Sequence, residues 1–239
     1  ELDAFERNLD RMDASLKSRS IKLRPHAKSH KCPEIAKHQI ARGAVGVCCQ
    51  KVSEAEALVD GGVSDVLIAN EVVGAPKLKL LVALAKRARV AVCADDSGNV
   101  TALDDAARAA GVRLDVLVEV NVGANRCGVA PGEPALRLAQ AISRSRNLRF
   151  AGLQAYQGAA QHLRKVEERR AAIEAACAHV RETVELLEDA RIPCERVTGA
   201  GTGTYMFEAV SGVYHELQAG SYIFMDVDYA KNDWTESGI

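Results

Sequence analysis

Eight short apolar runs alternate with longer amphipathic segments along the chain, and this alternation constrains the fold more than any other feature. The runs cover residues 21–23, 44–49, 65–70, 90–94, 114–121, 148–156, 194–199 and 217–224. Helical periodicity predicts helices at roughly 3–19, 32–42, 53–61, 75–88, 98–110, 133–146 and 163–190, with a short one near 204–210. Nearly continuous apolar strands between such helices are typical of a parallel sheet covered by helices. The strand count and the length of 239 residues favour a closed (β/α)8 barrel over an open doubly wound sheet, which is the alternative.

Composition and charge exclude several classes of protein. The formal net charge is −1, which predicts no bulk attraction to nucleic acid or to an anionic membrane surface. No apolar run approaches the roughly 20 residues that span a membrane, and the charged first residues do not resemble a signal peptide. The seven cysteines form no paired CxxC motif. Most of them are therefore expected to be small core residues in a reduced, cytoplasmic setting.

Polar residues gather where the predicted strands end, which is where barrel enzymes carry their active sites. The first such segment is RPHAKSHK, residues 24–31. If the first strand continues through it, strand alternation points Arg24, His26, Lys28 and His30 to one side. Desolvation and neighbouring cations would then lower the pKa of Lys28, which suits Schiff-base chemistry. A salt-bridged lysine at the rim is the alternative that the residues alone leave open.

Two further strand ends carry candidate anion-binding groups. TGAGTGTY, residues 198–205, follows the seventh predicted strand, and its backbone N–H groups and threonine hydroxyls can hold a phosphate. This segment is neither a Walker loop nor GxGxxG, so an ordinary glycine-rich turn is the alternative. Arg126, in GANRCGV, can anchor a carboxylate, a phosphate or a phenolate, or it is a surface arginine in a turn.

Other catalytic patterns are not supported. His26 and His30 lie four residues apart on a β-like segment, and no HExxH motif occurs, so their spacing predicts no zinc site. The absence of GxSxG argues against a serine nucleophile of the hydrolase type. The adjacent Asp95 and Asp96 are better explained as a turn or helix N-cap than as an acid/base pair.

A set of longer motifs resembles the fold-type III pyridoxal-phosphate enzymes of the D-threonine aldolase and 3-hydroxy-D-aspartate aldolase family, which is related to D-serine dehydratase. Besides RPHAKSHK, the motifs are GVCCQKVSEAEALVDGG, DVLIANEV, NRCGV, GLQAYQGAAQH, GAGTGTYMFE and YHELQAGSYIFMDVDY. They occur in order over nearly the whole chain. The resemblance implies an alanine-racemase-like (β/α)8 barrel that binds pyridoxal 5'-phosphate.

The resemblance also implies roles for individual residues. Lys28 would bind the cofactor covalently, Arg126 would contact its phenolic oxygen, and Tyr156 would lie beside the ring. Gln50 would lie close to the cofactor, and Gln218 would stand opposite the pyridine nitrogen, where a neutral amide cannot hold a positive charge. The phosphate would be held by loop residues with Tyr222 nearby: Gly199, Gly201, Thr202, Gly203, Thr204, Gly220 and Ser221.

By the same resemblance, the expected activity is retro-aldol cleavage of a D-3-hydroxy amino acid, such as D-threonine or 3-hydroxy-D-aspartate, to glycine and an aldehyde or glyoxylate. His162 or His30 would act as the base or position it. Family members are homodimers and require a divalent metal (Mn, Mg or Zn), with ligands in a C-terminal β domain. Residues 1–225 are therefore expected to form the barrel and residues 226–239 an exit segment towards that missing domain. No metal ligand is predicted within this sequence.

Three alternative functions remain at this stage. The first is a pyridoxal-phosphate dehydratase acting on D-serine or D-threo-3-hydroxyaspartate. The second is a non-catalytic pyridoxal-phosphate carrier, since such proteins are single barrels of about this size. The third is a phosphate-binding barrel without pyridoxal, which requires Lys28 to be a plain rim lysine.

Overall fold

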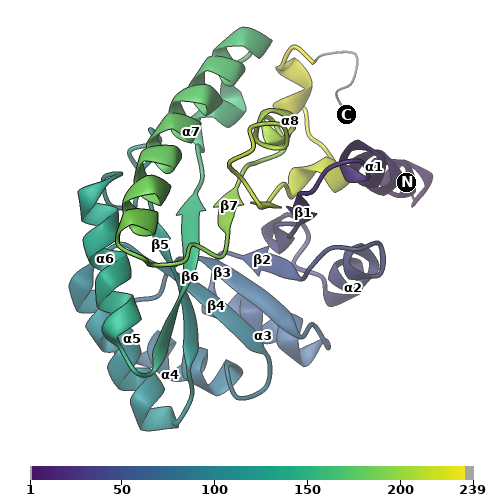
Figure 1. Ribbon diagram of the computed structural model, residues 1–239. Helices are drawn as coiled ribbons and strands as arrows, with labels where there is room; N and C mark the ends of the chain where they lie inside the picture. The colour runs from purple at the N-terminus through teal and green to yellow at the C-terminus, as the bar shows by residue number, and fades with distance from the viewer. Residues whose placement is uncertain (1, 235–239) are drawn as a thin grey trace.

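The computed structural model describes residues 2–234 and contains one fully parallel, eight-stranded sheet. The strands are β1 (Lys22–Leu23), β2 (Val47–Cys49), β3 (Asp65–Glu71), β4 (Arg89–Ala94), β5 (Leu114–Glu119), β6 (Leu148–Ala155), β7 (Val197–Gly199) and β8 (Glu216–Leu217). Their order is β1-β8-β7-β6-β5-β4-β3-β2, which follows the sequence and then returns to its start. Figure 1 shows the sheet curled at the centre of the molecule. The predicted (β/α)8 arrangement is confirmed, and the doubly wound alternative is wrong.

Backbone contacts between the β1 and β2 segments close the curl. The N–H of Val45 donates to the carbonyl of Leu23 at 2.9 Å, and the N–H of Cys48 donates to the carbonyl of Pro25 at 3.0 Å. His26 and Cys48 form a further parallel bridge. Because the strands are all parallel and closed, their carboxyl ends meet around one opening.

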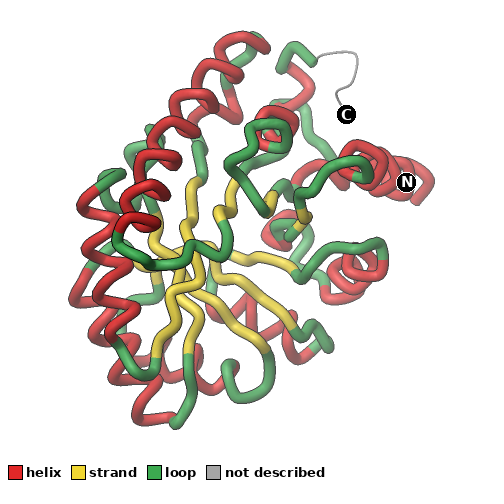
Figure 2. Tube along the Cα trace, viewed as in Figure 1, coloured by secondary structure: helices red, strands yellow, loops and turns green. Residues whose placement is uncertain are grey.

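Helices surround the sheet on its outer side (Figure 2). They are α1 (Leu2–Leu16), α2 (Pro33–Ala41), α3 (Val52–Asp60), α4 (Ala75–Leu84), α5 (Ser97–Ala110), α6 (Glu133–Arg144), α7 (Val166–Asp189) and the short α8 (Tyr205–Glu208). Prolines occupy the first turns of α2, α4 and α6, where no N–H donor is needed. Asp96 caps α5 by accepting from the N–H of Asn99 at 2.9 Å, which confirms its predicted capping role. No helix within residues 2–234 is long and apolar enough to cross a membrane.

The apolar core has two layers because successive strand residues point to opposite faces of the sheet. The larger cluster lies between the sheet and the helices and includes Val66, Ile68, Val90 and Val92. The alternate positions form a second, smaller cluster: Cys48, Leu67, Ala91, Cys93, Leu117 and Ala151. Two of the cysteines therefore fill the barrel interior, as the sequence predicts. All seven cysteine thiols are free.

Several strands are shorter than predicted, and the departures at β1 and β8 affect the site. β1 ends at Leu23, and residues 27–29 form a 3-10 turn instead, because Pro25 cannot donate to the strand ladder. The expectation that Arg24, His26, Lys28 and His30 alternate onto one face is therefore wrong. β8 ends at Leu217, and Ser221–Ile223 is a second 3-10 turn.

Candidate active site

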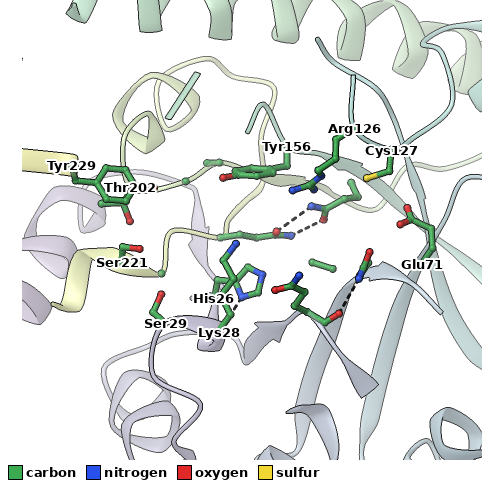
Figure 3. Close-up of a pocket in the computed structure, with 18 residues that line it drawn as sticks. His26, Lys28, Ser29, Glu71, Arg126, Cys127, Tyr156, Thr202, Ser221 and Tyr229 are labelled. Atoms are coloured by element: carbon green, nitrogen blue, oxygen red, sulfur yellow. Dashed lines mark hydrogen bonds between the residues drawn. The ribbon is translucent and has the colours of Figure 1, made fainter. Parts of the chain in front are cut away.

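A cavity of about 260 Å³ opens at the carboxyl ends of the strands. It lies where a barrel fold places catalytic residues, and Figure 3 shows the side chains around it. Nine of the residues predicted from the sequence line it: Lys28, Gln50, Arg126, Tyr156, Gly201, Thr202, Gln218, Gly220 and Ser221. These residues come from six separate segments of the sequence that the closed barrel brings together.

Lys28 lies on the 3-10 turn that follows Pro25, beside His26. The backbone N–H of Lys28 donates to Nδ1 of His26 at 3.3 Å, so the His26 ring is held against the turn that carries Lys28. Desolvation is the largest cause that lowers the pKa of Lys28; Cys48 opposes the shift, and the charge of Arg126 reinforces it. Burial, followed by the charges of Lys28 and Arg126, lowers the pKa of His26 to about 3. The turn therefore presents a lysine whose environment favours the neutral amine, next to a neutral imidazole.

Arg126 lies over the ring of Tyr156, on the other side of the cavity from Lys28 (Figure 3). The guanidinium carbon is 5.5 Å from the ring centroid, a cation–π distance. Its Nη2 also lies 3.7 Å from Oε1 of the buried Glu119. The Arg126 side chain is still 57% exposed, so its remaining N–H donors are available to an anionic ligand.

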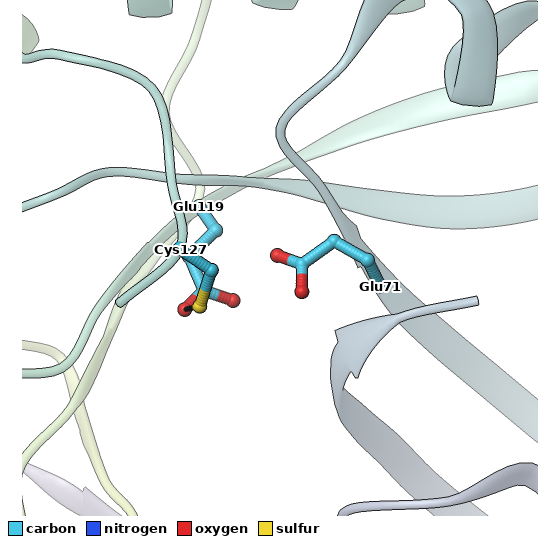
Figure 4. A group of neighbouring side chains, drawn as sticks. All are labelled: Glu71, Glu119 and Cys127. Atoms are coloured by element: carbon cyan, nitrogen blue, oxygen red, sulfur yellow. Dashed lines mark hydrogen bonds between the residues drawn. The ribbon is translucent and has the colours of Figure 1, made fainter. Parts of the chain in front are cut away.

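An acidic group, absent from the sequence predictions, forms another part of this opening (Figure 4). Ligand atoms of Glu71, Glu119 and Cys127 all lie within 4.8 Å of one another. The thiol of Cys127 donates to Oε1 of Glu119 at 2.8 Å, whereas Oε1 of Glu71 and Oε2 of Glu119 are buried and meet no donor. Burial, and then the charge of Glu119, raises the pKa of Glu71 to about 8. A proton on Glu71 satisfies this contact at neutral pH, and a divalent cation is the other occupant that such ligand atoms would suit.

The predicted phosphate loop supplies an unsatisfied donor to the cavity. Thr202 is 1% exposed, yet its hydroxyl has no hydrogen-bond partner among the described residues. Gly220 closes the opposite edge, since a Cβ there would lie 2.5 Å from the carbonyl oxygen of His26 and 2.8 Å from Oγ of Ser29. A buried hydroxyl without a partner, beside closely approaching backbone and the amine of Lys28, fits a phosphate-bearing cofactor that also carries an aldehyde.

Six predicted residues do not line the cavity, and each has a contact that accounts for its position. Tyr222 is buried and accepts from Nε2 of Gln39 at 2.9 Å. Thr204 donates to Glu208 at 2.8 Å, and Nδ1 of His30 accepts from the N–H of Cys32 at 3.0 Å. Gly199 ends β7, and Gly203 donates its N–H to Gln161. The sixth is His162.

His162 lies outside the cavity lining and is 62% exposed. Its Nδ1 is 2.7 Å from Oδ2 of Asp228, and Arg164 donates to the other oxygen of that carboxylate at 2.7 Å. The segment after β6 is therefore joined to the exit segment by a hydrogen-bonded ion cluster. Residues 235–239 of that exit segment lie outside the described residues.

Several cavity residues were not predicted as site residues. They are His26, Ser29, Ala69, Asn70, Glu71, Cys127, Gln154, Ala200 and Tyr229. Most lie beside predicted strand ends, and this position in the sequence is the feature that could have identified them as site residues. Tyr229 has no such feature, because it comes from the exit segment, which lacks periodicity.

Three comparisons with known proteins agree with this geometry. The family model described as "Alanine racemase, N-terminal domain" matches residues 1–228. The chain is 50% identical over 234 residues to D-threonine aldolase from an Arthrobacter species, covering 98% of this chain and 62% of that protein. It is 47% identical over 233 residues to 3-hydroxy-D-aspartate aldolase from Paracoccus denitrificans strain Pd 1222, covering 97% and 60% of the two chains.

A solved structure is similar over nearly all of this chain. The crystal structure of D-threonine aldolase from Filomicrobium marinum has a TM-score of 0.96 and 56% sequence identity, covering 98% of this chain and 63% of that chain. The chain thus spans about three fifths of the length of these relatives.

Proposed function

The chain belongs to the alanine racemase N-terminal domain family, and from this premise we propose that it is the barrel of a pyridoxal 5'-phosphate-dependent lyase. The proposed reaction is retro-aldol cleavage of a D-3-hydroxy amino acid to glycine and an aldehyde or glyoxylate. One observation carries the proposal: the desolvated amine of Lys28 shares a cavity with the unpartnered hydroxyl of the buried Thr202. Together they suit a ligand that bears both an aldehyde and a phosphate.

Different residues of the cavity would bind different parts of this cofactor. Lys28 would hold it covalently, and Gly201, Thr202, Gly220 and Ser221 would hold its phosphate. Arg126 would donate to the phenolic oxygen. Tyr156 and Gln50 would contact the ring, and Gln218 would face its nitrogen. When bound, the cofactor supplies the electron sink that the cleavage of a Cα–Cβ bond requires.

The protein's own groups would supply binding and proton transfer. The lowered pKa of Lys28 favours the neutral, nucleophilic form of its amine, and Arg126 would neutralise negative charge at the cavity. His162 is the proposed base or positioning group, because Asp228 holds its Nδ1 and leaves Nε2 to accept a proton. His30 is less suited, because burial lowers its pKa and its Nδ1 already accepts from Cys32.

The remaining parts of the proposal concern the longer protein. We propose that residues 226–239 lead to a C-terminal β domain, which contributes the ligands of a divalent metal (Mn, Mg or Zn). We also propose that the enzyme is a cytoplasmic homodimer. The relatives' greater length supports a further domain.

The test uses the full-length protein with pyridoxal phosphate, manganese and D-threonine or 3-hydroxy-D-aspartate. Glycine with acetaldehyde or glyoxylate supports the proposal, and His162→Ala is expected to lower kcat about tenfold or more, as loss of a general base does. A keto acid with ammonia would establish the dehydratase instead. Bound cofactor without turnover would indicate a carrier, and a folded protein that binds phosphate but no pyridoxal phosphate would overturn the whole proposal.

A further inference from the structure

A line of buried polar side chains runs from Arg24, in the segment after β1, to the cavity. Arg24 pairs with Glu216 of β8 at 2.9 Å, and the hydroxyl of Thr198 donates to Glu216 at 3.0 Å. Nε2 of Gln218 donates to the Thr198 hydroxyl at 2.8 Å, and Gln218 is also bonded to Gln154 of β6. Each of these five residues is at most 5% exposed, so water does not satisfy them. Only Gln154 and Gln218 line the cavity.

The charged pair of Arg24 and Glu216 determines which group donates and which accepts in each hydrogen bond between this pair and Gln218. A guanidinium stays protonated in proteins, and Arg24 is held between Asp65 at 2.6 Å and Glu216 at 2.9 Å. The carboxylate oxygens of Glu216, which face this guanidinium, therefore act as hydrogen-bond acceptors. Because Thr198 has one hydroxyl proton, and a bond to a charged acceptor is the stronger choice, this proton points to Glu216.

The hydroxyl of Thr198 can then offer only its lone pairs to Gln218. The group of Gln218 that faces Thr198 must be the NH2 group, because an oxygen there would meet another acceptor. The second N–H of this group donates to Oε1 of Gln154 at 2.7 Å, and Nε2 of Gln154 donates back to Oε1 of Gln218 at 3.1 Å. Both N–H groups of Gln218 are thus used, and one lone pair on Oε1 remains.

We infer that Arg24, Glu216 and Thr198 are positioning residues that fix the amide of Gln218, so that Gln218 offers the cavity an acceptor and no donor. A ligand atom that reaches this amide must therefore carry a proton. Applied to pyridoxal phosphate, the inference rests on the proposed function: the ring nitrogen exists with or without a proton, and Gln218 selects the protonated form. This replaces the expectation from the sequence that a neutral amide cannot hold that nitrogen charged, because the fixed amide offers only an acceptor. Arg24 thus acts on the cavity from a distance, although it does not line it.

The first test needs no cofactor and uses the full-length protein with 15N-labelled glutamine side chains. In the wild type, both side-chain N–H groups of Gln218 are expected to exchange slowly with solvent, while Gln154 retains one N–H without a partner among the described residues. Thr198→Val, which keeps the side-chain shape, should speed the exchange of one Gln218 N–H about fivefold or more, the effect of one lost hydrogen bond. Thr198→Ser keeps the hydroxyl and should match the wild type. Fast exchange of a Gln218 N–H in the wild type, or no change in Thr198→Val, would overturn the inference.

The second test uses the full-length holoenzyme with cofactor labelled with 15N in the ring. The ring-nitrogen chemical shift should report a protonated nitrogen in the wild type and in Thr198→Ser, and a shift towards the unprotonated form in Thr198→Val. An unprotonated nitrogen in the wild type contradicts the inference while leaving the lyase proposal intact. If the protein binds no cofactor, the proposed function fails, and the exchange measurement still decides the orientation of Gln218.

Discussion

The side chains around the cavity opening form a basic wall and an acidic wall, and burial shifts pKa values in the two walls in opposite directions. The basic wall consists of His26, Lys28 and Arg126, and the acidic wall consists of Glu71, Glu119 and Cys127. Desolvation lowers the pKa of Lys28 and raises the pKa of Glu71, so burial shifts each group towards its neutral form. The comparison shows that burial acts on the two signs of charge in opposite directions, favouring the neutral amine in one wall and the neutral acid in the other.

The walls also differ in how the chain builds them. His26 and Lys28 come from one tight turn after Pro25, whereas Glu71 and Glu119 come from the ends of β3 and β5. Arg126 and Cys127, one from each wall, are neighbours in the loop after β5, across the cavity from Lys28. One ion pair joins the two walls, between Arg126 and Glu119 at 3.7 Å. Changes within a wall should therefore act on its own neutral group, whereas changes at Glu119 should act on both walls.

The largest expected effect comes from removing the amine of the basic wall. Lys28→Ala should abolish covalent retention of the cofactor and lower kcat by about 10³-fold or more, as loss of a nucleophile does. Gel filtration of the full-length holoenzyme followed by its visible spectrum measures retention. Lys31→Ala is the matched control, because Lys31 is 63% exposed and pairs only with Glu54 at 3.4 Å, and it should stay within twofold of the wild type. Retained cofactor absorbance in Lys28→Ala would contradict this assignment.

The next largest effect comes from displacing the basic wall without changing its charge. In Gly220→Ala, the new Cβ would lie 2.5 Å from the carbonyl oxygen of His26, so the turn that carries Lys28 must move. Overpacking of this kind costs about 1 to 3 kcal/mol of stability, and cofactor affinity should fall about tenfold. Thermal unfolding and equilibrium titration with pyridoxal phosphate measure the two effects.

A matched control for that change exists in α5. Gly98→Ala places its Cβ 3.0 Å from Oδ1 of Asp96 and meets no backbone of another element, so it should leave both measurements nearly unchanged. Equal effects of the two substitutions would show that the basic wall tolerates displacement.

The third prediction concerns the ion pair between Arg126 and Glu119, which joins the two walls. Glu119→Gln removes the carboxylate that pairs with Arg126, and the half-exposed pair predicts only about three- to fivefold weaker cofactor binding. The same change removes a like charge beside Glu71, so the pKa of Glu71 should fall from about 8 towards its ordinary value. NMR titration of the Glu71 carboxyl carbon measures the shift. An unchanged pKa would mean that desolvation alone sets it, and unchanged cofactor binding would mean that the walls are independent.

The sequence predicts one wall well and the other poorly, for a physical reason. Periodicity is a local property, so the eight strands, the outer helices and the strand-end position of Lys28 follow from the residues alone. The acidic wall depends on register: the pairing of β3 with β4 shifts between Ile68 and Glu71, which breaks the alternation that would predict where Glu71 points. The partnership of Glu119 with Cys127 depends on how the loop after β5 folds back. His162 was predicted from its strand-end position, but its pairing with Asp228 involves an exit segment without periodicity.

The smallest expected effect is a change in the pH dependence of stability caused by the acidic wall. Folded Glu71 keeps its proton up to about pH 8, whereas an unfolded carboxyl releases it near 4.5, so the free energy of unfolding falls as pH rises through this window. Glu71→Gln should remove this part of the slope. The slope of the free energy of unfolding is expected to change by about a few tenths of a kcal/mol per pH unit. One full proton would contribute about 1.4 kcal/mol per pH unit, and Glu71 contributes less because it is only half-buried.

Chemical denaturation of the wild type and Glu71→Gln between pH 6.5 and 8 measures the difference in slope. His26, whose pKa falls from about 6.5 to about 3 on folding, contributes equally to both proteins and cancels in this difference. The control is Glu133→Gln, an exposed residue paired with Arg137 at 3.7 Å, which should leave the slope at its wild-type value. An equal slope in Glu71→Gln and the wild type would mean that Glu71 is ionised in the folded protein. The two walls would then differ in kind, with a neutral amine on one side and a charged, unpaired carboxylate on the other. Such a carboxylate would need a cation, and in that case added Mn²⁺ or Zn²⁺ should stabilise the wild type more than Glu71→Gln.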